Sequence, residues 1–109
     1  MTKICFKFME GNIAAYDISG HTGFDSAGTD IVCAGITSAV RLTECCITDI
    51  LGLRANILVD NENAIIKFKL PLKMTGEEKK ICQTILQALR LYLKELAAEY
   101  PEFIEVLEV

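Results

Sequence analysis

The sequence predicts an α+β fold, a mainly antiparallel sheet with two helices on its faces, in the order β-β-α-β-β-α-β and arranged as a layered sandwich. Two pairs of short segments alternate apolar and polar residues across tight polar turns, as β-hairpins do. Two longer segments repeat apolar residues at helical spacing. No linker, repeat or low-complexity segment interrupts these elements, so residues 1–109 are expected to form one domain.

The first hairpin is predicted from alternation near the N-terminus. Ile4, Phe6 and Phe8 fall on one side of a strand, with more polar or charged residues between them. A Glu-Gly-Asn turn at 10–12 leads into a second apolar run at 13–18. We therefore expect these two segments to pair as antiparallel strands.

The first helix is predicted over residues 31–51. Thr29 or Asp30 is its expected N-cap, and Gly52 its expected end. The helix is apolar almost all round, which predicts burial on more than one side. Under this prediction Cys33 lies in the first helical turn.

The second half of the chain is predicted to contain another hairpin, another helix and a final strand. Apolar runs at 54–59 and 64–70 flank a polar turn at 60–63, which predicts a second hairpin. Thr75 has capping-box spacing to a glutamate three residues later, so the second helix is expected to begin there. Residues 103–109 alternate glutamates with apolar residues, which is typical of a strand at a sheet edge.

The net charge indicates which partners to expect, and the length of the apolar runs indicates the location. A net charge of −4 argues against a nucleic-acid interface, which needs clustered Lys and Arg, and it suits a basic partner. Residues 1–9 lack the apolar block of a signal peptide. No apolar run is expected to approach the roughly 18 to 20 residues that span a bilayer. We expect a cytoplasmic protein with no nucleic-acid or membrane partner.

The cysteines indicate a reducing compartment rather than a disulfide framework or a metal site. There are five, an odd number, without regular spacing. The chain has no Cys-x-x-Cys motif and one histidine, so no zinc site, no other metal and no cofactor are expected.

Cys33 and His21 are the candidate reactive pair. Cysteine attacks as a thiolate, and histidine is the side chain best suited to take its proton near neutral pH. A helix start at Cys33 would favour the thiolate, and the backbone amides of Cys33 and Ala34 would face an oxyanion. Two simpler interpretations stay open: Cys33 is a small apolar filler, and Asp30 is only a helix cap rather than a group that also orients His21.

A specific resemblance strengthens this pair. The segment GHTGFDSAGTDIVCAG, residues 20–35, resembles the bacterial ribosomal-processing cysteine proteases (Prp), whose pattern is Gly-His, a short variable loop, and Gly-x-Asp-apolar-Val-Cys-Ala. The resemblance covers nearly the whole chain in length and element order. It implies that Cys33 is the nucleophile, His21 the general base and Asp30 a supporting polar group. Matching positions are Gly20, His21, Gly28, Asp30, Val32, Cys33 and Ala34.

The family resemblance also implies a substrate and an assembly. Such proteases remove a short N-terminal extension from a large-subunit ribosomal protein, the twenty-seventh in the standard numbering, and the resemblance favours a homodimer. The chain departs from the pattern at Thr22, where a small residue is expected, and at Cys45 and Cys46. These departures leave Cys33 and His21 intact but put in doubt any third catalytic group from that helix.

The loop between the first hairpin and the first helix is the candidate substrate loop. Gly20, Gly23 and Gly28 give its backbone freedom, and Thr22 and Phe24 lie between them. Such a loop either closes over an extended peptide as a lid or only connects a strand to a helix.

Two functions from other classes stay open. One is a non-catalytic peptide- or anion-binding module built from the glycine-rich loop and the helix N-terminus, although the loop has no Lys or Arg to bind phosphate. The other is a redox sensor that uses Cys33 or the pair Cys45 and Cys46.

Overall fold

The computed structural model describes residues 1–20 and 27–109, with side chains described for 1–20 and 31–109. Its elements confirm the predicted order, with a short π-helix, η1, continuing the first α-helix. In chain order they are β1 (Thr2–Met9), β2 (Asn12–Ser19), α1 (Ala27–Glu44), η1 (Cys45–Ile50), β3 (Asn56–Asp60), β4 (Ile65–Lys69), α2 (Gly76–Glu99) and β5 (Ile104–Glu108).

One five-stranded sheet has the strand order β3-β4-β2-β1-β5. All neighbouring strands are antiparallel except β1 and β5, which are parallel, and β5 forms the edge predicted for residues 103–109. Phe6 pairs with Tyr16 across β1 and β2, and Tyr16 pairs with Phe68 of β4. The Tyr16 and Phe68 rings stack with centroids 4.8 Å apart, so aromatic side chains form the centre of the sheet.

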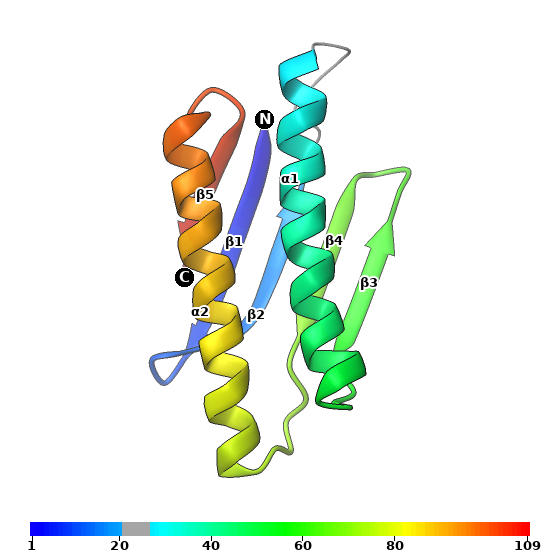
Figure 1. Cartoon of the computed structure of the whole chain (residues 1–109), viewed down its shortest axis with the longest axis vertical. Helices are drawn as coiled ribbons and strands as arrows, with labels where there is room; N and C mark the ends of the chain where they lie inside the picture. Colours follow the sequence, from blue (N-terminus) through cyan, green and yellow to red (C-terminus); the bar gives the residue numbers. More distant parts are fainter. Residues whose placement is uncertain (21–26) are drawn as a thin grey trace.

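Both helices lie on the same face of this sheet (Figure 1). The predicted α+β class is therefore confirmed, but helices on both faces are not found. The strand registers explain this, because the face opposite the core includes charged side chains such as Lys7, Asp17 and Lys67. Lys7 and Asp17 form an ion pair of 2.8 Å there, in which both side chains are partly solvent-accessible. A sheet face of this kind is stable in water and needs no covering layer.

Helix α1 buries one stripe rather than several sides. Val32, Ile36, Val40 and Ile47 are at most 3% exposed, whereas Ile31, Leu42 and Ile50 are 65–78% exposed. The prediction of burial on more than one side is wrong, because in the described residues one stripe packs into the core and the other faces are exposed. The prediction that no apolar run is long enough to span a bilayer is also wrong: residues Ile31–Ile50 reach that length and hydropathy. Here the buried stripe of this segment packs into the core of the domain.

Helix α2 begins as predicted. Thr75 is its N-cap: its hydroxyl accepts a hydrogen bond from the Glu78 amide (3.1 Å), and its own amide donates to the Glu78 carboxylate (2.8 Å). The Gln83 side chain then bonds both the amide and the carbonyl of Ile13 at 2.8 Å, which fixes α2 against the start of β2. Its buried stripe is Cys82, Leu86, Leu89 and Leu93.

Candidate active site

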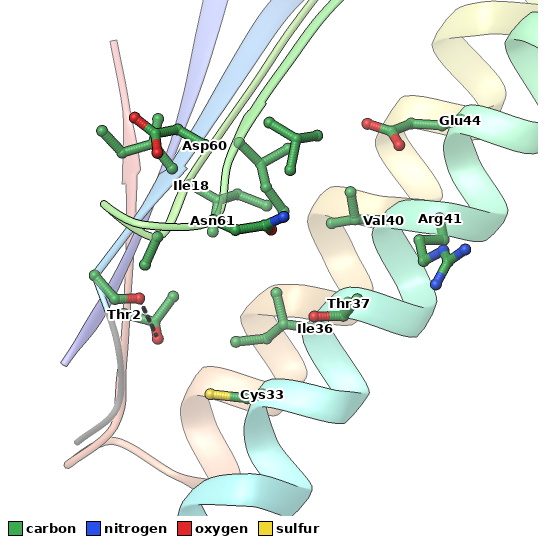
Figure 2. Close-up of a pocket in the computed structure, with 15 residues that line it drawn as sticks. Thr2, Ile18, Cys33, Ile36, Thr37, Val40, Arg41, Glu44, Asp60 and Asn61 are labelled. Carbon is green, nitrogen blue, oxygen red and sulfur yellow. Dashed lines mark hydrogen bonds between the residues drawn. The ribbon is translucent and has the colours of Figure 1, made fainter. Parts of the chain in front are cut away.

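A groove of about 470 Å³ runs between α1 and the β3–β4 hairpin, and we call it the hairpin groove. Figure 2 shows that Cys33, Ile36, Val40 and Glu44 project from α1 toward the hairpin, with the Cys33 sulfur pointing into the groove. Cys33 is half-buried. The lining residues labelled in the figure are Thr2, Ile18, Cys33, Ile36, Thr37, Val40, Arg41, Glu44, Asp60 and Asn61.

Cys33 lies in the second turn of α1, not in the first. The helix begins at Ala27, so Thr29 and Asp30 are inside it, and the prediction that one of them is the N-cap is wrong. The apolar periodicity begins at Ile31, although that side chain is itself 65% exposed. A helix can begin earlier with small and polar residues, which also serve as caps, so periodicity alone misplaces the start.

This earlier start removes the premise for the predicted oxyanion donors. Only the first four amides of an α-helix lack an acceptor within the helix. The amides of Cys33 and Ala34 come after those four residues, so the helix itself supplies their acceptors. The electrostatic effect of the helix N-terminus also falls off within the first turn. The role of these two amides as oxyanion donors stays a prediction, without a helix start at Cys33 as its premise.

The other predicted site residues divide into two groups. His21, Thr22, Gly23 and Phe24 lie outside the described residues, as does the question of a lid. Gly28 and Asp30 belong to α1 by their backbone, but their surroundings are outside the description. The pairing of His21 with Cys33 and the supporting role of Asp30 therefore stay predictions.

Gly20 is the loop residue that the structure does place, and it lines the hairpin groove. Its amide donates to the Ala64 carbonyl (3.1 Å), and its carbonyl accepts from the Thr2 hydroxyl (3.4 Å). Its φ is +90°, and a Cβ at this position would lie 2.6 Å from the Met1 carbonyl oxygen. Only glycine fits here without strain, and it fixes the point where the chain leaves β2 beside the groove.

The groove end remote from Cys33 contains a carboxylate that the sequence reasoning missed. The Tyr16 hydroxyl donates to Glu44 Oε2 at 3.3 Å. Burial raises the pKa of Glu44, while the Tyr16 hydrogen bond and the nearby Arg41 charge act in the opposite direction. Burial, followed by the Glu44 charge, raises the pKa of Tyr16 far above its ordinary value, so its hydroxyl remains a donor.

A signal for these missed residues exists in the sequence. Thr37, Arg41 and Glu44 follow Cys33 at intervals of four, four and three, which is the spacing of one helical face. Polar residues at that spacing on an otherwise apolar helix indicate a face that lines a cavity or groove. The apolar periodicity of the same helix predicts only its buried stripe.

Two of the remaining cysteines, Cys45 and Cys82, do not resemble reactive thiols. A hydrogen bond with Asp49 raises the pKa of Cys45, and burial raises that of Cys82. Reactive cysteines have lowered pKa values. The raised pKa of Cys45 therefore disfavours a redox role for this member of the Cys45–Cys46 pair. Among the described residues, no three Cys, His, Asp or Glu side chains gather closely enough to hold a metal ion.

Comparison with known proteins supplies the family. The profile described as "Cysteine protease Prp" matches residues 1–105. The chain belongs to the Prp family of cysteine proteases. It is accordingly a cysteine peptidase with a role in ribosomal processing, as the resemblance at residues 20–35 predicted.

Relatives of the Prp family share the fold at low sequence identity. The ribosomal processing cysteine protease Prp of Bacillus subtilis is 21% identical over 94 residues, which cover 86% of this chain and 84% of that protein. The crystal structure of SMU.848 from Streptococcus mutans covers 100% of this chain and 94% of its own, with TM-score 0.89 and 22% identity. The essential Prp from S. aureus, in complex with a substrate peptide, covers 100% of both chains with TM-score 0.85 and 21% identity.

Proposed function

We propose that this protein is an endopeptidase that removes the N-terminal extension of the twenty-seventh large-subunit ribosomal protein. One observation carries the proposal: Cys33 lies at one end of a long groove whose floor is apolar, formed by Ile36, Val40 and Ile66 among others. A groove of this shape accommodates an extended peptide and presents its backbone to the thiol. The substrate peptide in the S. aureus relative supports the same use of this fold.

The chemistry follows from a thiol and an imidazole. His21 takes the proton from Cys33, whose sulfur attacks the scissile carbonyl carbon and forms a C–S bond. When the C–N bond breaks, His21 gives the proton to the departing amine and leaves a thioester on Cys33. His21 then takes a proton from water, the hydroxide attacks the thioester, and the carboxylic acid leaves as Cys33 recovers its proton.

The test is mass spectrometry of a synthetic peptide that spans the N-terminus of the host ribosomal protein. We expect the wild type to cleave one bond, Cys33→Ala to cleave none, and Cys45→Ala, a matched change outside the groove, to behave as the wild type. Cleavage by Cys33→Ala would overturn the nucleophile. No cleavage by a folded wild type would overturn the protease and favour the non-catalytic binding module.

We also propose a cytoplasmic homodimer that pairs through the outer faces of the two helices. An apolar groove between α1 and α2 is lined by Ala39, Leu42, Ile85 and Tyr92 among others, and Leu42 is 67% exposed. Sedimentation is expected to show a dimer for the wild type and a monomer for Leu42→Glu. Leu72→Glu, at an exposed site outside this groove, is the control that stays dimeric. A monomeric wild type would contradict the homodimer.

A further inference from the structure

The end of the hairpin groove opposite Cys33 contains the carboxylate of Glu44, which lines the groove from α1 (Figure 2). A second carboxylate, Asp60, lines the opposite wall from the end of β3, at the level of Ser19 and Ile65. Asp60 accepts hydrogen bonds from the amide and the side chain of Asn63 at 3.2 and 2.7 Å, which lower its pKa. Among the described residues, neither carboxylate forms a salt bridge. Glu44 therefore stands as the carboxylate at this groove end and is not neutralised by a salt bridge within the described part of the chain.

The position of Glu44 is fixed by the core rather than by solvent. Its partner, Tyr16, is completely buried and stacks on Phe68, so the hydroxyl that holds the carboxylate has little room to move. Glu44 is itself partly buried, and burial raises its pKa. A carboxylate that has lost part of its hydration gains more from a cationic partner than an exposed one does.

The surface between Cys33 and Glu44 is suited to a long cationic side chain. Ile36 and Val40 line this stretch from α1, and Ile18 and Ile66 line it from the sheet. Lysine and arginine have an apolar stem and a charged tip, which match an apolar floor that ends in a carboxylate.

Helix geometry gives the distance at which such a side chain is recognised. Glu44 follows Cys33 by eleven residues in a helical segment, so the two positions are about 16 Å apart along the axis at ~1.5 Å per residue. An extended peptide covers that distance in about five residues at ~3.3 Å each. We propose that Glu44, held by Tyr16, is a specificity-determining residue that selects substrates with Lys or Arg about five residues from the scissile bond. This inference rests on the proposed use of the hairpin groove for a peptide.

Arg41 further restricts the position along the groove at which a substrate cation can bind. It lines the same groove one turn before Glu44 and is exposed. Its charge opposes a substrate cation placed closer to Cys33 than Glu44 is. Moving the lysine of a peptide two residues toward the scissile bond is therefore expected to weaken binding.

The test measures peptide binding by fluorescence anisotropy on the Cys33→Ala protein, so that no probe is cleaved. The probes are peptides from the N-terminus of the host ribosomal protein, with either lysine or norleucine at the fifth residue on each side of the scissile bond. On one side, lysine is expected to bind roughly three- to tenfold more tightly than norleucine, as a partly buried ion pair provides. Adding Glu44→Gln is expected to abolish that difference, whereas the matched change Glu95→Gln, on the exposed surface of α2, preserves it.

The outcomes separate this inference from the proposed function. Equal affinity for lysine and norleucine on both sides, a preference that survives Glu44→Gln, or no binding by any peptide would overturn the specificity role. Wild-type cleavage of both peptides at equal rates would overturn it as well and leave the protease intact. A lysine preference that depends on Glu44, found in a folded wild type that cleaves neither peptide, would support the groove and overturn the protease. Circular dichroism of each variant confirms that it is folded.

Discussion

The two helices are similarly long, yet they differ in what fixes them and in what they do. Helix α2 begins at a capping box, bonds to Ile13 through Gln83, and buries one regular stripe against the sheet. Helix α1 also buries a stripe of apolar residues, but it lines the groove that contains Cys33 as well. Helix α2 therefore mainly stabilises the fold, whereas α1 combines a core stripe with a face that lines the groove of Cys33.

The largest expected effect on the free energy of unfolding is at a buried leucine of α2, compared with an exposed leucine of α1. Leu86 of α2 is completely buried, and Leu86→Ala is expected to lower the free energy of unfolding by about 2–5 kcal/mol through lost burial and a residual cavity. Leu42 of α1 is 67% exposed, and Leu42→Ala is expected to change it by less than ~0.5 kcal/mol in the monomer. Urea unfolding at low protein concentration measures both. Equal losses would contradict the difference in burial between the two leucines.

A smaller effect tests the two helix starts. Thr75→Ala removes the N-cap of α2 and is expected to cost about 1 kcal/mol in unfolding free energy. Thr29→Ala lies inside α1, where alanine is the better helix former, so no loss is expected. Thermal unfolding of both variants gives the comparison. A loss at Thr29 as large as that at Thr75 would restore Thr29 as a cap.

The smallest effect is a pH dependence at Glu44. Because burial raises its pKa in the folded protein, the folded state binds more protons than the unfolded state between the ordinary and the raised pKa. This residue's contribution to stability therefore falls as pH rises through that window. The melting temperature of Glu44→Gln, relative to wild type, is expected to increase across the window and then stay constant. A relative melting temperature that decreases with pH would contradict the raised pKa.

The sequence predicted most of the fold because local signals coincided with global ones. The alternation in β1 and β2, the polar turn after β3 and the Thr75–Glu78 capping box each define an element through its own residues. The start of α1 was missed because residues 27–30 are small or polar and fit either a helix or a cap. The bare sheet face was missed because the direction of each helix over the sheet depends on long-range packing.

Only the Cys33 end of the candidate site was predictable from the sequence. Cys33, predicted as the nucleophile, lines a groove, and the family match agrees with the motif at residues 20–35. Glu44 was missed because its importance depends on Tyr16, which lies 28 residues away in the sequence and meets it only in the folded protein. The polar spacing from Cys33 to Glu44 marks a face of the helix, but it does not indicate the contact with Tyr16.

The π-helix η1 begins directly after Glu44, and its position bears on how the chain tolerates changes in length. Its wider turn is closed by the bond from the Leu51 amide to the Cys46 carbonyl, and the Thr48 hydroxyl bonds the Glu44 carbonyl at 2.7 Å. A π-turn holds one residue more than the α-helical turn that it replaces. Deleting a residue such as Asp49 can therefore be absorbed by a return to α-helical pitch, with the face from Cys33 to Glu44 unchanged. A deletion at this joint would let the length of the chain change independently of its specificity.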